Sequence, residues 1–431
     1  RPNRLAGPFV TTDDDYRGPF DPDWTLERLS RSALARLCRE RMILSMFHDR
    51  ALMPHVAIHA GQEATIRQAD SEWMGASPIY TARNKANLGI RGDGPEAALK
   101  SFQFDIGAPH HFLDFRFELV DDNLGMFWLP FCGAHDYLRQ ISRNDPALVT
   151  NMCHHMEDRT FDATLAVTNP QLRAVPVHRP PKPDEFTGDH CRWRVELVDD
   201  EPSKRAGEPS LDVVAESAAA SFAFELGDAF EDGGMHDYSG PIIPDLRLEN
   251  FAHPVLVRQA KEFALDIHLL MRAAYFSVDE NIGVDLLDEI ATQHRAAIAP
   301  AVVRRLRDAL AVEGNDMTTI AKMLQLDPFL VEDYVDYRVE VYDERTGTIE
   351  FLGGAGLNDS VCRSPMDWLD GFIHTAQSVN PRCVVEQVGP RSWSLYIDPD
   401  AAPVEPHWLA DMADGGGLRN FDLTERRVEI R

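Results

Sequence analysis

Side chains that could bind a metal or transfer protons gather in the segment Cys153-His154-His155-Met156-Glu157-Asp158. The spacing of apolar residues predicts a helix from about residue 146 to 161. In a helix, His154 lies on the same face as Glu157 and Asp158, which follow it by three and four residues. Imidazole and carboxylate groups that converge from one rigid element can hold Zn, Fe or Mn. An exposed polar helix face with a buried thiol is the alternative interpretation.

A second thiol and imidazole, Cys132 and His135, follow a strand predicted over residues 125–130. Functional residues are often found just beyond the end of a strand. This pair indicates either metal ligands or a nucleophilic cysteine with its base. A buried thiol beside a helix-capping His135-Asp136 pair explains the same residues without function.

Further histidines precede these segments. His55 and His59 are four residues apart, and Glu63 continues the same face if the segment is helical. His110 and His111 stand just before a strand that begins near Phe112, so at most one of the two points into any site. Each of these pairs is a weak signal by itself.

Composition limits the classes of partner. The chain has 43 Lys plus Arg against 70 Asp plus Glu, a formal charge of -27, which repels nucleic acid and anionic membrane surfaces. No stretch approaches the roughly 18 to 20 apolar residues of a membrane span. Six cysteines are too few for a disulfide-stapled fold of this size. We therefore expect a cytoplasmic protein with a small-molecule substrate, and neither nucleic acid nor membrane as a partner.

The chain repeats itself at one constant offset, the one that separates Asp114 from Asp336. The alternating segment Asp114–Asp121 returns as Asp336–Asp343, which predicts a half-buried strand in each copy. The same offset aligns other residues without a gap, namely Arg50 with Arg272, Gly61 with Gly283, Gly92 with Gly314, Lys100 with Lys322 and Gln103 with Gln325. A repeat of this length predicts two copies of one structural unit.

These patterns predict an α+β fold built by tandem duplication. Each copy is expected to have a helical half and a small antiparallel sheet, and the two copies to pack as an intramolecular pseudo-dimer. The expected parts are an N-terminal extension (1–23), a first copy with the active site (24–200), an acidic linker (201–250), a degenerate second copy (251–400) and a C-terminal tail (401–431). A homodimer of whole chains is left open.

The two copies differ most at residues suited to chemistry. Histidines and a cysteine of the first copy are replaced in the second, where His55 faces Ser277, His59 faces Asn281, His110 faces Glu332, His111 faces Asp333, His135 faces Asn358 and Cys132 faces Ala355. The fold tolerates these losses, so the first copy is expected to carry the function.

Cys132, Cys153 and the closing segment Gly188-Asp189-His190-Cys191-Arg192-Trp193 resemble, in type and order, the L-2-amino-thiazoline-4-carboxylic acid hydrolase family. They are more distantly similar to the vinyl-reductase-type small-molecule-binding domain. The resemblance covers about residues 60 to 198. It implies an α+β domain with a ligand cavity and, in the hydrolase branch, cleavage of a C–N or C–S bond in a small heterocycle. The chain departs from the family pattern in having Pro130 and Phe131 before the first cysteine, which leaves the substrate open.

The sequence therefore predicts a metal-dependent hydrolase in which a Zn, Fe or Mn ion activates a water molecule. The expected metal ligands are His55, His59, His135, His154 and Glu157. The expected catalytic residues are Glu157, Asp158, Cys132 and Glu63, and the secondary candidates are His110, His111, His155, Cys153 and Cys191. One alternative is an oxygen-dependent non-haem iron enzyme, since two histidines and a carboxylate suit Fe(II). Another is a binding module in which the cysteines and a histidine hold a structural metal.

Overall fold

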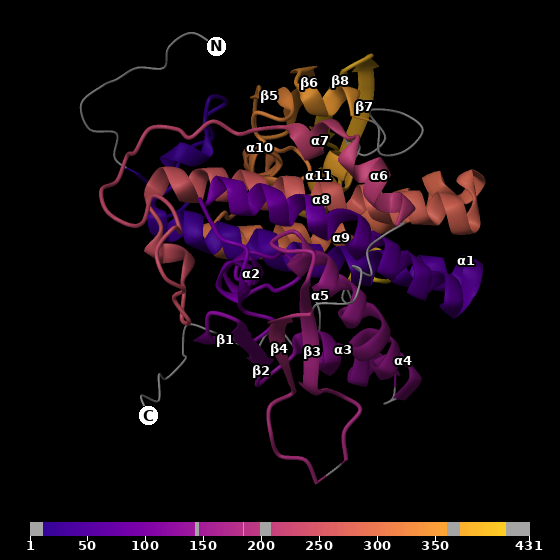
Figure 1. The fold of residues 1–431 in the computed structure, drawn as a ribbon. Helices are drawn as coiled ribbons and strands as arrows, with labels where there is room; N and C mark the ends of the chain where they lie inside the picture. The colour runs from indigo at the N-terminus through magenta and orange to yellow at the C-terminus, as the bar shows by residue number, and fades with distance from the viewer. Residues whose placement is uncertain (1–11, 143–145, 184, 199–207, 360–370, 411–431) are drawn as a thin grey trace.

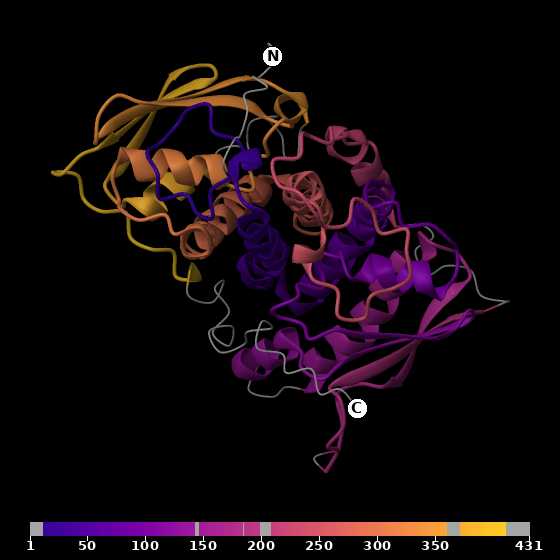
Figure 2. The same ribbon diagram turned by 90° about the vertical axis from the view of Figure 1, so that its left-hand side faces the viewer.

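The computed structural model describes residues 12–142, 146–183, 185–198, 208–359 and 371–410. The fold is α+β, as predicted, with two four-stranded antiparallel sheets. Figures 1 and 2 show these sheets on opposite sides of a central group of long helices. We refer to residues 24–200 as the first half and to residues 251–400 as the second half. Their boundaries as domains stay a prediction.

The centre of the first half is α1 (Arg31–Asn87), which bends at Gly61. Ser30 caps its first turn by accepting a hydrogen bond from the amide of Ala33. Gly61 has φ 78° and ψ 179°, a conformation that essentially only glycine adopts. The bend brings the two arms of α1 side by side, and the indole of Trp73 on one arm donates to the carboxylate of Asp49 on the other at 3.1 Å.

The second half has the same arrangement in α8 (His253–Ile282) and α9 (Val284–Leu310). Gly283 separates them with φ 101° and ψ 155°, at the position that the repeat aligns with Gly61. The hydroxyl of Tyr275 lies 2.7 Å from Nδ1 of His294, so these arms also run side by side. Helix α1 packs against both α8 and α9, and this contact forms the core between the two sheets.

The two sheets have the same strand order. The first runs β1-β2-β4-β3 and the second β5-β6-β8-β7, with every neighbouring pair antiparallel. The strands of the first sheet are β1 (Arg116–Asp121), β2 (Leu124–Leu129), β3 (Leu172–His178) and β4 (Cys191–Leu197). Those of the second are β5 (Asp336–Val341), β6 (Thr346–Gly353), β7 (Cys383–Gly389) and β8 (Ser392–Ile397). The strand predicted from the repeated alternation is thus present in both halves, as β1 and β5, each within an antiparallel sheet.

One face of each sheet packs on a helix through aromatic rings. In the first sheet Trp193 pairs with Phe127 across the strands, and the ring of Phe161 meets Trp193 edge-on with centroids 5.1 Å apart. In the second sheet Phe372 meets Trp393 in the same way at 5.5 Å. Such edge-on contacts stabilise the packing beyond simple burial of apolar area.

Shorter elements complete both halves. The first half contains α2 (Pro95–Phe102), α3 (Gly133–Ser142), α4 (Pro146–Thr150), a π-helical turn (Asn151–Met156) and α5 (Glu157–Ala166). The predicted helix over 146–161 is therefore helical but carries a π-helical turn. The connecting segment contains α6 (Pro209–Ala215) and α7 (Ala218–Ser221), and the second half adds α10 (Met317–Leu326), a 3-10 turn (Ala355–Asn358) and α11 (Gly371–Val379). Within the described ranges, no helix is both long and apolar enough to cross a membrane.

Candidate functional site

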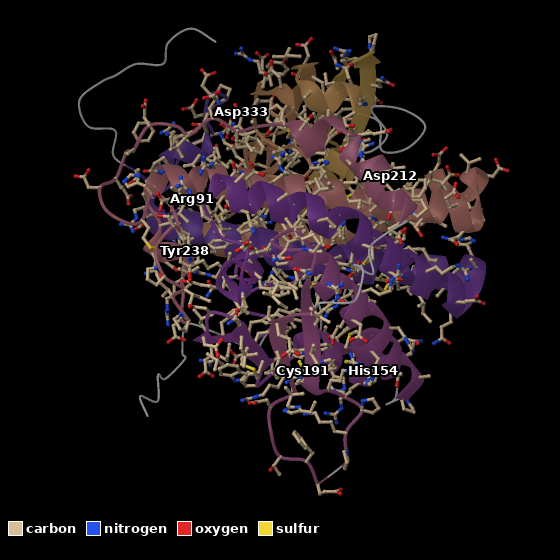
Figure 3. All side chains as sticks on the ribbon, viewed as in Figure 1. Arg91, His154, Cys191, Asp212, Tyr238 and Asp333 are labelled. Atoms are coloured by element: carbon tan, nitrogen blue, oxygen red, sulfur yellow. The ribbon has the colours of Figure 1, made fainter. Side chains whose placement is uncertain are left out.

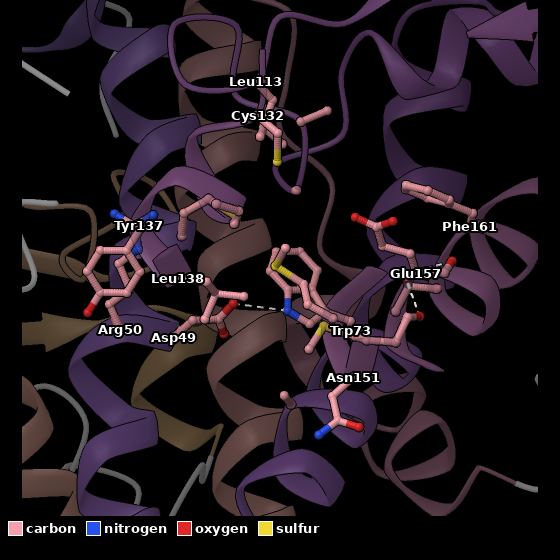
Figure 4. Close-up of a pocket in the computed structure, with 18 of the residues that line it drawn as sticks. Asp49, Arg50, Trp73, Leu113, Cys132, Tyr137, Leu138, Asn151, Glu157 and Phe161 are labelled. Carbon is pink, nitrogen blue, oxygen red and sulfur yellow. Dashed lines mark hydrogen bonds between the residues drawn. The ribbon is translucent and has the colours of Figure 1, made fainter. Parts of the chain in front are cut away.

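A cavity of about 270 Å³ lies in the first half, with walls from α1, α3, the π-helical turn and α5. Its wall is mainly apolar and includes Met46, Met53, Ile66, Phe102 and Phe161. Figure 4 shows Asp49, Arg50, Trp73, Cys132 and Glu157 among the side chains around it. A mostly apolar pocket with a few polar groups is the usual form of a small-molecule site.

The bend at Gly61 places two acidic residues of α1 together beside this cavity. Asp49 lines the wall, and Glu72 is buried directly behind it, where it accepts a hydrogen bond from Gln68. Burial raises the pKa of Asp49 to about 6, and burial together with the Asp49 charge raises the pKa of Glu72 well above its ordinary value. Two carboxyl groups this close cannot both ionise easily, so each disfavours ionisation of the other.

The wall contains two further carboxyl groups, Asp105 and Glu157, of which Glu157 is the first residue of α5. The Oε2 of Glu157 is buried without a hydrogen-bond partner among the described residues. Burial raises its pKa to about 8, against the opposing effect of the nearby Arg179 guanidinium. A carboxyl group with this pKa can both accept and release a proton near neutral pH.

Three buried thiols surround Glu157, since its charge raises the pKa of Cys132, Cys153 and Cys191 alike. Cys132 lines the cavity, and its Sγ accepts a hydrogen bond from the amide of His135 at 3.4 Å. Burial is the largest cause in each case and raises the pKa of Cys132 to about 12. All three groups are therefore neutral thiols near pH 7.

The predicted ligand His154 and the predicted catalytic residue Asp158, on either side of Glu157, contact other protein groups. His154 lies with Nε2 2.8 Å from the carbonyl oxygen of Pro180, to which it donates, and Asp158 forms an ion pair with Arg179. Both side chains therefore contact the neighbouring residues 179 and 180. His155 is exposed and lines, with His154 and Asp158, a second pocket of about 280 Å³. Figure 3 shows His154 and Cys191 in the half that carries β1–β4.

His55, His59 and Glu63 lie elsewhere on α1. His55 is buried with its ring against His407 and Trp408, at centroid distances of 5.3 and 5.9 Å. Burial lowers the pKa of His55 to about 4, so its imidazole is neutral at physiological pH. His59 and Glu63 are exposed, and Glu63 pairs with Arg67 at 2.7 Å.

The other histidines predicted as site residues, His135, His110 and His111, also contact protein groups. The ring of His135 packs on that of His190 at 4.5 Å, and burial lowers the pKa of both. His110 Nε2 lies 2.7 Å from the carbonyl oxygen of Gln103. His111 lies between Arg305 at 3.0 Å and Glu40 at 3.5 Å.

In the part of the chain that the structure describes, no three His, Cys, Asp or Glu side chains are grouped so that they could hold a metal ion. The predicted set of His55, His59, His135, His154 and Glu157 is thus not brought together as one ligand sphere. Of the predicted catalytic residues, Glu157 and Cys132 line the cavity, whereas Asp158 and Glu63 form ion pairs outside it. Metal binding stays a prediction.

Sequence reasoning missed the α1 side of the cavity. Asp49, Arg50 and Trp73 line it, with Glu72 behind. One signal was present, because the charged pair Asp49-Arg50 interrupts a segment, Met42–Met53, that is otherwise rich in apolar residues. Charged residues inside an apolar helical segment are costly to bury and often functional.

The chain matches no protein-family model, no curated protein and no solved structure. The resemblance to heterocycle hydrolases accordingly stays a prediction, and a function has to be inferred from the cavity.

Proposed function

We propose that this protein is an enzyme that binds a small, largely apolar substrate in the cavity of the first half. Glu157 serves as its general acid and base. The observation that carries this proposal is the Glu157 carboxyl group, which sits in a mainly apolar wall with an unpartnered oxygen among the described residues and a pKa of about 8. Catalytic carboxyl groups are commonly tuned to this range by burial.

The first reaction to test is hydrolysis of a C–N or C–S bond, which the resemblance to heterocycle hydrolases suggests. As a base, the Glu157 carboxylate takes a proton from water while the water oxygen bonds to the substrate carbon. The same group then gives that proton to the nitrogen or sulfur of the bond that breaks. Cys132 is a poor nucleophile by comparison, because burial keeps it protonated by raising its pKa.

The test is a screen of small cyclic amides, thiazolines and thioesters for hydrolysis by the whole chain, followed by Glu157→Gln. This variant keeps the shape of the side chain but cannot transfer the proton, so we expect kcat to fall by about 10²- to 10⁴-fold. Asp158→Asn is the matched control, because it makes the same change at a carboxylate that pairs with Arg179. Hydrolysis that survives in Glu157→Gln contradicts the proposed role.

A binding module without turnover is the second candidate, and the mainly apolar wall with its protonated thiols favours it. Ligand binding by the wild type and by Glu157→Gln with equal affinity, together with no hydrolysis of any compound in the screen, would support this candidate.

The metal-dependent reaction predicted from the sequence is a separate proposal. Elemental analysis of protein purified without added metal tests it, beside the His154→Ala, Glu157→Ala double variant. Near-stoichiometric Zn, Fe or Mn that is lost in the variant would support it, and iron would call for a measurement of oxygen consumption. Wild-type protein that holds no metal after reconstitution with each ion would contradict it.

We also infer that the chain is a tandem duplication whose halves pack as a pseudo-dimer, with the second half as the degenerate structural partner. The inference is supported by ion pairs that occur twice, each time with both partners exchanged for their equivalents at the repeat offset. These are Arg83–Glu262 with Arg305–Glu40, and Arg39–Glu249 with Lys261–Glu27. Reciprocal contacts of this kind are typical of an interface with twofold symmetry.

A further inference from the structure

Arg50 brings a positive charge into the wall of the cavity. Its side chain is buried, and its Cζ lies 3.9 Å from the ring centroid of Tyr137 and 4.5 Å from that of Phe112. Both Nη1 and Nη2 lack a hydrogen-bond partner among the described residues. Burial lowers the pKa of Arg50 only to about 10, so the guanidinium is still charged at neutral pH. A buried charge without an ionic partner is costly and therefore unusual.

The equivalent arginine of the second half has such a partner. Arg272, which the repeat aligns with Arg50, is buried and donates to the carboxylate of Asp359. That carboxylate also accepts hydrogen bonds from the hydroxyl of Tyr334 and, at 3.0 Å, from the amide of Ala219. In the second half, the carboxylate of Asp359 thus neutralises the guanidinium of Arg272.

The first half places an aromatic ring beside its arginine because a helix, α3, follows β2, whereas a 3-10 turn follows β6 within the described residues. The two segments begin alike, since Gly133 donates to the carbonyl of Phe112 and Gly356 to that of Tyr334, both at 2.9 Å. In the first half the chain continues as α3, which brings Tyr137 onto Arg50. In the second half only the 3-10 turn Ala355–Asn358 forms within the described residues, and Asp359 then turns inward.

Asp49 does not take the place of Asp359. Its carboxylate lines the same cavity, but its Oδ2 accepts the hydrogen bond from Trp73. No ion pair joins Asp49 to Arg50 within the described residues, although the two charges interact through space. Figure 4 shows Arg50 with Tyr137 on one side of the cavity and Glu157 with Phe161 on the other.

We propose that the ligand of this cavity carries a carboxylate group, which binds the Arg50 guanidinium as Asp359 binds Arg272 in the second half. The proposal rests on the proposed function in that both use one cavity. It concerns binding at Arg50 and does not depend on turnover at Glu157. The apolar part of the ligand lies against the apolar wall, and the bond to be broken lies toward Glu157.

The test compares matched acids and amides, 2-naphthoate with 2-naphthamide and octanoate with octanamide, by titration calorimetry of the full chain. We expect at least one acid to bind about 10- to 100-fold more tightly than its amide, as one charge-assisted hydrogen-bond pair provides. Tyr137→Asp should abolish this preference, because it supplies the internal carboxylate that the second half has. Tyr137→Phe is the matched control and should keep it, since the ring on Arg50 is retained.

The outcomes separate the two proposals. Amides that bind as tightly as their acids, no binding of either acid, or an acid preference that survives in Tyr137→Asp overturns the carboxylate site. Arg50→Met gives a second check, with its fold verified by circular dichroism, and should lose the preference as well. Glu157→Gln should retain the preference for acids, so loss of hydrolysis in that variant leaves the carboxylate site intact.

Discussion

The hydroxyl of Tyr238 donates a hydrogen bond of 2.8 Å to the side-chain oxygen of Gln103. Tyr16 makes the same bond to Gln325 at 2.6 Å, and the repeat aligns Tyr16 with Tyr238 and Gln103 with Gln325. The tyrosine that precedes each half therefore packs onto the other half. Such an exchange ties the two halves into one folding unit.

These two tyrosines allow a comparison of equivalent bonds. Tyr238 also accepts a hydrogen bond from the half-buried amide of Ile243, so Tyr238→Phe leaves this donor unpaired as well as the Gln103 acceptor. We expect Tyr238→Phe to lower the free energy of unfolding by about 2–3 kcal/mol and Tyr16→Phe by about 1 kcal/mol. Urea denaturation of both variants measures this, and an equal loss in both would contradict the difference.

A second prediction concerns the bend of α1. Space around Gly61 is open, so Gly61→Ala produces no clash and its effect comes from the backbone conformation at φ 78°. We expect a loss of about 1–3 kcal/mol in the free energy of unfolding. Gly353→Ala is the control, because that glycine also has open space but no positive φ, and it should change stability by less than about 0.5 kcal/mol.

The repeat and the local patterns predicted the frame of this fold well, for a physical reason. The repeat aligns Gly61 with Gly283, and each occupies a backbone conformation that other residues avoid. The alternation in Asp114–Asp121 and its second copy reflects strands with one buried face. Such signals act over a few residues and can be read without the tertiary fold.

The candidate site was predicted only in part, because its members come together through the tertiary fold. Glu157 and Cys132 line one cavity, but the partners of His154 and His55 are a carbonyl oxygen and the residues 407–408. The repeat shows Arg50 only as a residue that both copies retain. Its functional interest comes from the lack of an ionic partner among the described residues, a feature that only the tertiary fold reveals.

The third prediction is a pH dependence. Burial raises the pKa of Glu157 from 4.5 to about 8, so the folded state binds a proton that the unfolded state releases in that range. The wild type should therefore lose stability from this group as pH rises between those values. Glu157→Gln removes the effect and should gain on the order of 2 kcal/mol relative to the wild type over this range, allowing for partial exposure. Denaturation at several pH values measures the difference, and a constant difference would contradict the raised pKa.

A fourth prediction contrasts two ion pairs. Asp359→Ala leaves Arg272 buried without its carboxylate, which should lower the free energy of unfolding by about 3–5 kcal/mol. Glu63→Ala breaks an exposed pair with Arg67 and should cost less than about 1 kcal/mol. Glu63→Ala should also leave any hydrolytic activity unchanged, so a large loss of activity would restore the catalytic role predicted for Glu63 from the sequence.

The last prediction separates a buried thiol from an activated one at Cys132. Burial raises its pKa to about 12, and the side chains of Cys153 and Cys191 are buried with raised pKa values as well. Since the thiolate is the reactive form, iodoacetamide should modify these three residues in the native protein only slowly at neutral pH. Peptide mass spectrometry should find full modification after unfolding in urea, which serves as the control. Rapid labelling of Cys132 in the folded chain would instead identify it as a nucleophile and shift the chemistry of the cavity from Glu157 to the thiol.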